Sequence, residues 1–299
     1  MICVVGGANV DIVGTANANI IMRDSNPGRI VYAAGGVGRN MAESFRRMGM
    51  EVMLVTALGM DENAQFIRAN CAQLGIDLTH AFAISEARTS TYLCINGADG
   101  DLVLAISDMD VCDRLSPERL SGVVDVLNAC EMCVLDANLS KSAIDFLATS
   151  IRVKIAADPV SVAKAPRLSG VLNRLTLLKP NLPEAERLTG LSANTCGVAG
   201  VAQALYNQGV KNVFLSLGAE GVYYMDAASE GHLPVCKGPI VDTTGCGDAF
   251  LAAAAMSILS GLTAYDAAKR ALAAAALHAA SKTVSETAID RALQNGGIQ

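Results

Sequence analysis

Short apolar runs rich in β-forming residues alternate with helical patterns along most of this 299-residue chain. Short strands that are apolar on both faces are typical of a parallel sheet covered by helices on both sides. The alternation therefore predicts an α/β fold with a doubly wound, mostly parallel sheet sandwiched by helices. The expected strands are residues 2–5, 52–57, 132–136, 154–158, 176–178 and 213–217.

Two segments depart from this alternation. Residues 90–96 and 102–106 flank the turn-rich GADGD and predict a hairpin, and residues 10–31 contain β-like runs separated by Asn, Gly and Pro. We expect one domain over residues 1–299, with a small β-sheet inserted as two segments of about residues 10–33 and 88–109. Such a sheet would cover an active site as a lid or pair with a second subunit, so a homodimer through the lid is expected.

Composition limits the classes of partner. The chain is 52% hydrophobic and 17% charged, which excludes a disordered chain, collagen and a coiled coil. Its net charge of −6 and the lack of a Lys/Arg run argue against nucleic acid and anionic membranes as partners. The longest nearly apolar stretch, 250–259, is shorter than the ~20 residues that span a bilayer. The first residues have no basic segment of a signal peptide, so a cytoplasmic location is expected.

The nine cysteines are an odd number and are scattered through apolar segments, which favours reduced thiols. Cys130 and Cys133 form one CxxC, but the three histidines lie far away in the sequence. Since zinc sites need further ligands nearby, we interpret this pair as a junction between a helix and a strand.

The glycine motifs of common nucleotide-binding folds are absent. The chain has no GxxxxGK[ST], and GGANVD stands where a GxGxxG would follow the first strand. P-loop and dinucleotide-binding interpretations are therefore disfavoured, although an NAD-dependent oxidoreductase stays open as a weaker alternative.

The most informative motif is DTTGCGDAF at 242–250, followed by an Ala-rich helical run. Gly245, Cys246 and Gly247 are expected to place several backbone N–H groups at a helix N-terminus, where an anion such as a phosphoryl group is favoured. Asp248 would repel that anion unless it served as a general base that accepts a hydroxyl proton. A carboxylate that only stabilises its own helix start is the alternative.

Further glycine and polar residues follow other expected strands. Gly35, Gly36 and Asn40, in AGGVGRN, predict close backbone approach to a ligand, although a tight turn with a polar cap has the same pattern. The Asp11 carboxylate suits a vicinal diol, with Asn9 nearby. Asn181 and Glu184, one helical turn apart, suit a hydrated Mg²⁺, but the isolated NxxE is weak. Ligands of open α/β sheets bind at such strand ends.

Taken together, these motifs resemble the two signatures of the ribokinase-like (PfkB) family of carbohydrate and nucleoside kinases. The first signature runs from Gly35 through Asn40 to Gly59, the second is DTTGCGDAF, and the likeness extends from residue 2 to about residue 280. One departure is Cys246, where the family nearly always has Ala, Gly or Ser. We expect activity to survive because the backbone N–H is what binds.

The resemblance implies transfer of phosphate from ATP, with Mg²⁺, to a primary alcohol of a sugar or nucleoside. It implies Asp248 as the base and an anion hole at residues 245–247. It implies a sugar site at Asp11, Gly35, Gly36 and Asn40, and it implies that Asn181 and Glu184 hold the water molecules of Mg²⁺. It also implies a nucleotide-binding site at Asn181, Ser216, Gly218 and Gly221, and an activating K⁺ at Asp242 and Thr244.

The acceptor is indicated by three further segments, AISDMDV (105–111), LDANLS (135–140) and DPVSVAKA (158–165), which look like those of pseudouridine kinases within the family. This likeness implies Asn138 as a substrate residue. It also implies that Asp108, above the C1 substituent of the sugar, accepts a base N–H; a solvated residue at a strand end is the alternative.

Two further alternatives remain open, besides the NAD-dependent oxidoreductase named above. Another nucleoside or sugar kinase, like ribokinase, adenosine kinase or fructokinase, differs only in its acceptor. A non-catalytic regulator that binds a sugar or nucleoside would belong to a different class. The presence of Asp248 and the glycine loop argues against it.

Overall fold

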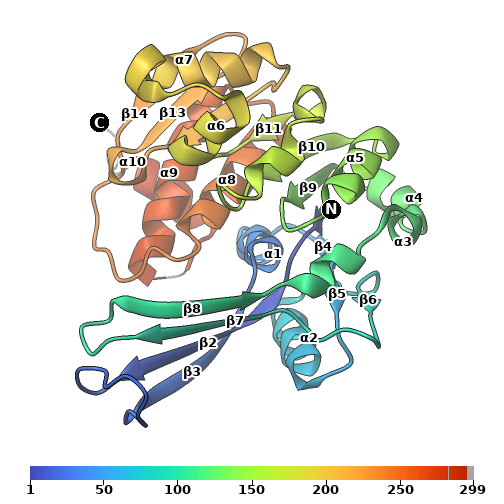
Figure 1. Cartoon of the computed structure of the whole chain (residues 1–299). Coiled ribbons are helices and arrows are strands. Elements are labelled where there is room, and N and C mark those ends of the chain that lie inside the picture. Colours follow the sequence, from blue (N-terminus) through green and yellow to red (C-terminus); the bar gives the residue numbers. More distant parts are fainter. Residues whose placement is uncertain (282, 295–299) are drawn as a thin grey trace.

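The main sheet holds the strands that the sequence predicts. The computed structural model describes residues 1–281 and 283–294, and its 8-stranded sheet has the order β14-β13-β12-β11-β10-β9-β1-β4 (Figure 1). Neighbours from β4 to β12 are parallel, whereas β13 and β14 are antiparallel additions. The strands are β1 (Ile2–Val5), β4 (Val52–Val55), β9 (Met132–Asp136), β10 (Lys154–Asp158), β11 (Leu177–Leu178), β12 (Val213–Ser216), β13 (Val222–Met225) and β14 (Glu230–Leu233).

Helices cover both faces of this sheet, because side chains along each strand alternate between two cores. In β1, Ile2 and Val4 belong to the core under α1, α8 and α9, whereas Cys3 and Val5 belong to the core under α3 to α7. The helices are α1 (Val37–Arg47), α2 (Glu62–Leu74), α3 (Pro117–Ser121), α4 (Val124–Asn128), α5 (Lys141–Ser150), α6 (Leu182–Thr189), α7 (Ala193–Asn207), α8 (Cys246–Leu259), α9 (Ala264–Ser281) and α10 (Glu286–Gln294). The doubly wound sandwich is confirmed.

Side chains cap the starts of two of these helices. Asp61 caps α2, and its Oδ1 accepts a hydrogen bond from the Ala64 N–H at 2.9 Å. Ser116 caps α3, whose C-cap is Gly122, and a separate short helix, α4, begins at Val124.

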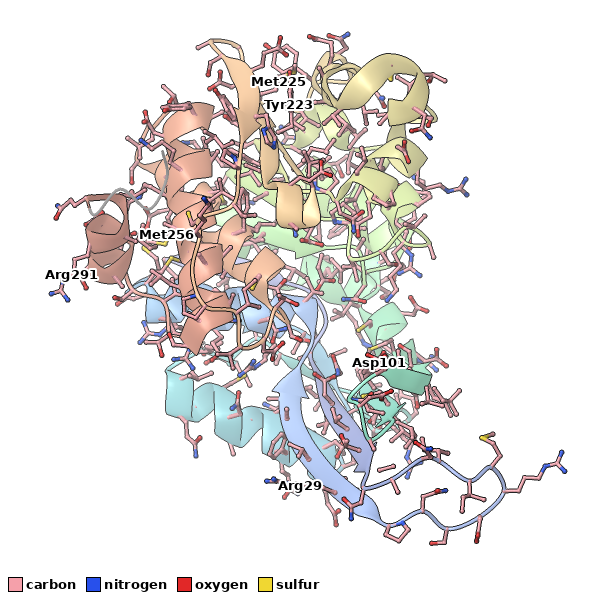
Figure 2. All side chains as sticks on the ribbon, turned by 90° about the vertical axis from the view of Figure 1, so that its left-hand side faces the viewer. Arg29, Asp101, Tyr223, Met225, Met256 and Arg291 are labelled. Atoms are coloured by element: carbon pink, nitrogen blue, oxygen red, sulfur yellow. The ribbon has the colours of Figure 1, made fainter. Side chains whose placement is uncertain are left out.

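The second, smaller sheet is also present, with the order β3-β2-β7-β8. Its strands are β2 (Asn9–Ala16), β3 (Gly28–Gly35), β7 (Thr91–Asn96) and β8 (Leu102–Asp108), and β7 and β8 form the expected antiparallel hairpin. Figure 1 shows this sheet projecting below the main domain. In Figure 2 the loop between β2 and β3 extends away from the body of the protein, beyond Arg29. A further pair, β5 (Ala57–Leu58) and β6 (Phe82–Ala83), contains the last residue of the expected strand 52–57.

The described ranges contain neither a membrane-spanning helix nor a cluster of metal ligands. No helix there is long and apolar enough to cross a bilayer. No three His, Cys, Asp or Glu side chains there are grouped so that they could hold a metal ion. All nine cysteines are free thiols, in agreement with the expectation from the sequence.

Candidate active site

Polar residues gather where the parallel strands end. Asp136 is the last residue of β9, Asp158 is the last of β10, Lys179 follows β11 directly, and Ser216 is the last of β12. Since parallel strands end at the same edge of a sheet, these side chains lie along one edge. The first turn of α8, with Asp248, also lies there, since a Cβ atom on Gly247 would lie 2.8 Å from Lys179 Nζ.

Asp136 organises the loop that follows β1. It is completely buried, and its carboxylate accepts the N–H of Gly7 and the N–H of Asn138, both at 2.8 Å. A Cβ atom on Gly6 would overlap this carboxylate. Burial raises the pKa of Asp136, while these hydrogen bonds oppose the shift. Asp136 was not predicted as a site residue, although a carboxylate at the end of an apolar strand is a detectable signal.

The structure brings the expected sugar-binding residues together. Asn9 Nδ2 donates to Asp11 Oδ1 at 2.6 Å, and a Cβ atom on Gly35 would overlap the Asp11 carboxylate. Gly36 has a φ of 96°, and a Cβ atom there would lie 2.6 Å from Ala8 Cα. Burial raises the pKa of Asp11. Asn9, Asp11 and the two glycines therefore form one polar surface at the base of the small sheet.

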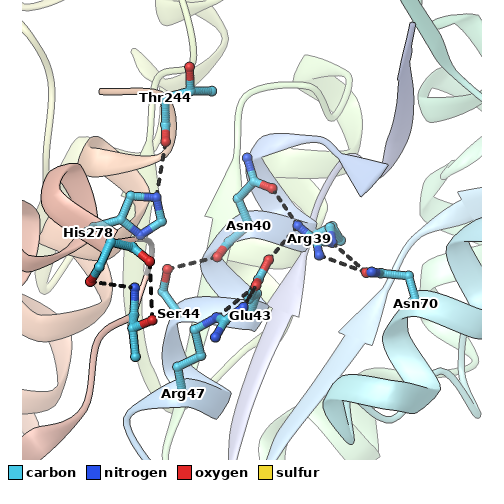
Figure 3. A network of polar contacts seen from close by, with 10 residues as sticks. Arg39, Asn40, Glu43, Ser44, Arg47, Asn70, Thr244 and His278 are labelled. Carbon is cyan, nitrogen blue, oxygen red and sulfur yellow. Dashed lines mark hydrogen bonds and ion pairs between the residues drawn. The ribbon is translucent and has the colours of Figure 1, made fainter. Parts of the chain in front are cut away.

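Arg39, which the sequence analysis did not single out, fixes Asn40 (Figure 3). The guanidinium is buried; its Nη1 donates to Asn40 Oδ1 at 2.9 Å and lies 2.6 Å from Glu43 Oε2. Its Nε and Nη2 both donate to Asn70 Oδ1. Because the amide oxygen is held in this way, the Asn40 amide is directed toward Asp248, whose pKa it lowers by hydrogen bonding.

Asp248 lies in the first turn of α8 and is only 8% exposed. Burial raises the pKa of its carboxyl to about 7, and the negative charge of Asp158 adds to the shift. The Lys179 ammonium and Asn40 act in the opposite direction. A carboxyl with this pKa is suited to accept a proton near neutral pH.

The helix N-terminus offers backbone donors, but not all of the expected ones. Gly245 precedes α8 with a φ of 85°, and neither its N–H nor that of Gly247 has a backbone acceptor within the described part of the chain. The Cys246 N–H instead donates to the Thr243 carbonyl at 3.1 Å. In this conformation the turn before the helix therefore uses the Cys246 N–H, and the anion hole at residues 245–247 stays a prediction.

The expected Mg²⁺ residues form a capping box at the start of α6. The Glu184 N–H donates to Asn181 Oδ1 and the Asn181 N–H to Glu184 Oε2, both at 2.9 Å. Glu184 is buried, and burial raises its pKa. The pair thus has a structural function at the helix start, and its carboxylate and amide oxygens are also of the type that binds hydrated Mg²⁺.

A cavity of about 330 Å³ adjoins this capping box. Asn181 and Ser216 form an isolated bridge in its wall, and the Ser216 hydroxyl donates to the Pro180 carbonyl at 3.3 Å. Gly221, with a φ of 102°, ends the following turn. The lining residues are Asn181, Leu182, Pro183, Val198, Ser216, Leu217, Gly218 and Glu220. One cavity is therefore lined by three of the residues expected to bind the nucleotide, namely Asn181, Ser216 and Gly218.

Asp242 and Thr244, the expected K⁺ residues, lie in the turn before α8. Asp242 Oδ1 accepts the Thr244 N–H at 2.8 Å, and the Thr244 carbonyl lies 3.0 Å from His278 Nε2 on α9 (Figure 3). The turn is therefore linked to α9 by a polar contact.

Asn138 lies at the same edge of the sheet and is held from two sides. Its Oδ1 accepts a hydrogen bond from Lys164 Nζ at 2.6 Å, and its carbonyl accepts one from Arg167 Nη1 at 2.9 Å. A Cβ atom on Gly7 would lie 2.9 Å from Asn138 Nδ2, so the amide faces the loop after β1. Asn138 therefore lies beside the loop that leads into β2, and its contact with a substrate stays a prediction.

Asp108, by contrast, does not join this group. The register of the small sheet aligns Val10, Thr91 and Asp108, whereas Asp11 is aligned with Tyr92 and Ser107. Aligned residues share a face and successive residues alternate, so Asp108 lies on the face opposite Asp11. The expectation that Asp108 stands above the sugar is therefore wrong for this conformation; Tyr92 and Ser107 lie on the face of Asp11.

A doubly wound sheet with a small second sheet, and a glycine turn that brings a buried carboxylate to a helix N-terminus, define the ribokinase-like class of phosphotransferases. The model of the pfkB family of carbohydrate kinases matches residues 1–291, and the chain belongs to this family. It is thus an enzyme that transfers phosphate to a hydroxyl group.

Relatives and solved structures support this classification. The chain is 32% identical to a pseudouridine kinase of Escherichia coli K12 over 87% of this chain and 84% of that protein. It is 33% identical to an uncharacterised sugar kinase of the same organism over 94% of this chain and 79% of the relative. A carbohydrate kinase from Agrobacterium tumefaciens matches with a TM-score of 0.88 and 30% identity, covering 98% of this chain and 96% of that chain.

Proposed function

We propose that the protein phosphorylates the 5'-hydroxyl of pseudouridine with ATP, giving pseudouridine 5'-phosphate and ADP. The main support is the buried Asp248 carboxyl, with a pKa raised to about 7 by burial, beside the Gly245 and Gly247 N–H groups. The choice of pseudouridine is supported by the likeness to the kinase of that name in E. coli.

In this proposal Asp248 accepts the proton of the attacking hydroxyl. The acceptor's oxygen attacks the terminal phosphorus of ATP while the bond to the bridging oxygen breaks and its electron pair leaves with ADP. The N–H groups of Gly245 and Gly247 stabilise the transferring phosphoryl group at the positive end of α8. Asn40 orients the Asp248 carboxylate through the side chain that Arg39 holds.

The ribose would bind to the polar surface at the base of the small sheet. The Asp11 carboxylate, oriented by Asn9, can accept from two neighbouring hydroxyls, and Gly35 and Gly36 let the backbone come close to the ring. The Asn138 amide, fixed by Lys164, faces the same loop. These side chains position the 5'-hydroxyl toward Asp248.

ATP would occupy the cavity beside α6, with Ser216, Gly218 and Gly221 on the nucleotide side. Asn181 and Glu184 would hold the waters of Mg²⁺, since a buried carboxylate and an amide oxygen suit that ion. Bound Mg²⁺ neutralises phosphate charge during transfer.

An activating K⁺ at Asp242 and Thr244 is part of the same proposal. Its test compares the rate of phosphorylation in KCl with the rate in tetramethylammonium chloride.

Other acceptors are the main alternative, because the chain is also 27% identical to a guanosine-inosine kinase of Exiguobacterium acetylicum. The deciding experiment offers pseudouridine, uridine, guanosine, adenosine, ribose and fructose with ATP and measures kcat/KM for each. The highest value for pseudouridine supports the proposal. A higher value for another acceptor would reassign the substrate within the family. Tight binding of these compounds without turnover would favour a non-catalytic protein that binds a sugar or nucleoside as a regulator.

We also propose a homodimer through the small sheet, which would then act as a lid. The face opposite Asp11 exposes large apolar side chains on both edge strands, namely Ile30, Tyr32, Leu104 and Ile106, which are 57% to 65% exposed. Such a face is favoured to pair with another apolar surface. Sedimentation of Ile106→Lys beside the exposed control Met60→Lys tests this: a monomer for the first variant alone supports the dimer, and an unchanged mass excludes it.

A further inference from the structure

Arg39 is a buried cation between two parts of the site. It is only 5% exposed, and its backbone N–H donates to the Gly7 carbonyl at 3.1 Å, which holds the first turn of α1 against the loop after β1. Burying a charge is costly unless it is paired, and apolar side chains of similar volume often replace a buried ion pair without loss of stability. The presence of an arginine here therefore indicates a function that an apolar side chain could not perform.

The guanidinium is held in one orientation by two helices. On α2, Asn70 Oδ1 accepts hydrogen bonds from Arg39 Nε at 3.1 Å and from Nη2 at 2.7 Å. On α1, Arg39 Nη1 lies 2.6 Å from Glu43 Oε2, and the other oxygen of Glu43 is held by Arg47 at 2.6 Å. Because a guanidinium is planar and its donors have fixed directions, these partners also fix where its remaining N–H groups point.

One of these N–H groups sets the orientation of the Asn40 amide. Arg39 Nη1 donates to Asn40 Oδ1 at 2.9 Å (Figure 3). An arginine has donors only, so it selects the oxygen of the amide and leaves the NH₂ group for a carboxylate. The hydrogen bond from Asn40 lowers the pKa of Asp248, against the burial that raises it. Arg39 therefore acts on Asp248 through Asn40.

The same guanidinium acts on the carboxylate at the sugar-binding surface. The Asp11 carboxylate packs on Gly35, where a Cβ atom would overlap it, two residues before α1 begins. Burial raises the pKa of Asp11, whereas the hydrogen bond from Asn9 and the positive charge of Arg39 lower it. One buried cation thus influences the carboxylates at both ends of the acceptor site.

We propose that Arg39 is a positioning residue shared by the two carboxylates of the site: it directs the Asn40 amide toward Asp248, and its charge balances the Asp11 carboxylate. Asn70, which lies outside the site on α2, is a second positioning residue because it holds Arg39. This inference rests on the proposed function and deepens it. No proton or electron moves through Arg39, and the transfer balances as given above.

The competing explanation is that Arg39 only joins α1 to α2. Arg47→Met is the matched control, since Arg47 also pairs with Glu43 but is 35% exposed, and its kinetics should stay near wild type. Misplacing a catalytic group by about 1 Å can cost about 10²-fold, so Arg39→Met should lower kcat by roughly 10- to 100-fold. It should also raise the acceptor KM, because the charge beside Asp11 is lost.

Arg39→Lys separates the two effects. A lysine keeps the positive charge, but one ammonium cannot hold Asn40, Glu43 and Asn70 in a single plane. The acceptor KM should therefore stay near wild type while kcat falls. The Tm of every variant is measured beside the kinetics, since a merely structural function would lower Tm without dividing kcat from KM.

The pH profile is a further readout that a merely structural function would not move. The other groups that face the two carboxylates are unchanged in these variants; they are Asp136, Asp158 and Lys179 around Asp248, and Asn9 and Cys94 around Asp11. Since Arg39 lowers the pKa of Asp11 directly and that of Asp248 through Asn40, the acid limb of kcat/KM should move to higher pH in Arg39→Met. It should stay in place in Arg47→Met.

Nuclear magnetic resonance gives the same comparison without turnover. The protein is labelled with ¹³C at the aspartate carboxyl carbons, and spectra of Asp248→Asn and Asp11→Asn assign the two signals. Both carboxyls should titrate at higher pH in Arg39→Met than in wild type. If wild type phosphorylates no acceptor and these shifts are still present, the proposed function fails while the link from Arg39 to the two carboxylates stands.

A folded Arg39→Met with the kcat, acceptor KM and acid limb of Arg47→Met would overturn the inference. Asn70→Ala serves as the test where Arg39→Met does not fold, because it releases two hydrogen bonds of the guanidinium and leaves its charge in place. Its kcat should fall by a smaller factor than in Arg39→Met, with an acceptor KM near wild type. An unchanged kcat in Asn70→Ala would equally count against the inference.

Discussion

Gly36 lies against the backbone of Ala8, so closely that a Cβ atom on Gly36 would lie 2.6 Å from Ala8 Cα and 2.6 Å from the Gly7 carbonyl oxygen. The first turn of α1 and the loop after β1 can therefore meet only through a glycine. This contact joins two segments that both supply residues to the sugar-binding surface.

Gly36→Ala is predicted to impair substrate binding, and Gly49→Ala is a matched control. Both glycines have positive φ values, 96° and 90°, but a Cβ atom on Gly49 would meet nothing within 4 Å. Both variants should lose roughly 1 kcal/mol or more of stability from the backbone conformation. Only Gly36→Ala should also raise the acceptor KM, as measured with steady-state kinetics. Equal KM values for the two variants would contradict the close approach at Gly36.

Asp248→Asn is predicted to lower kcat by about 10²- to 10⁴-fold, because the amide cannot accept the hydroxyl proton. The amide is nearly the same size as the carboxyl, so nucleoside affinity, measured by calorimetry, should change little. Near-normal turnover in this variant would remove Asp248 as the general base.

The pH dependence follows from the raised pKa of Asp248. Burial brings the pKa to about 7, and only the ionised carboxylate can accept a proton. For wild type, kcat/KM should therefore fall as the pH falls below about 7 and level off above it. Any acid limb that persists in Asp248→Asn belongs to another group, such as the nucleotide. A wild-type profile that stays flat down to pH 5 would conflict with the buried environment of Asp248.

Cys246→Ala is predicted to keep activity within a few-fold of wild type, since its N–H is used in the turn to Thr243 and alanine retains that bond. The neighbouring Gly245→Ala is the contrasting variant. Gly245 has a φ of 85°, and its Cβ atom would lie 2.7 Å from His278 Nε2, so kcat should fall strongly. Initial rates at saturating ATP make the comparison. A similar loss in both variants would show that the sulfur of Cys246 takes part.

Asp108→Ala tests the face on which this residue lies. The register puts Asp108 opposite Asp11, so the variant should change kcat/KM for pseudouridine by less than about threefold, well under the 1.4 kcal/mol that corresponds to a factor of ten. The control is Ser107→Ala, on the face of Asp11. A loss of 10- to 100-fold that is confined to nucleosides and spares ribose would instead restore the interpretation from the sequence.

Much of the fold could be predicted from the sequence because its signals are local. The strands Met132–Asp136 and Lys154–Asp158 have the predicted bounds, since each is a short apolar run between polar residues. The cap at Asp61 likewise depends on neighbours within one helical turn. The glycine turn before α8 is recognisable for the same reason, because a positive φ at Gly245 is a property of the local backbone.

The tertiary structure alone decided which side chains meet. Whether Asp108 or Ser107 shares a face with Asp11 depends on a strand register that joins segments far apart in the chain, and a shift of one residue exchanges the two faces. The contact of Lys179 with Asp158 and Gly247 likewise requires β10, β11 and α8 to be packed at one edge of the sheet. No local pattern around Lys179 specifies these partners, since long-range packing brings them together and burial then sets the pKa values of the site.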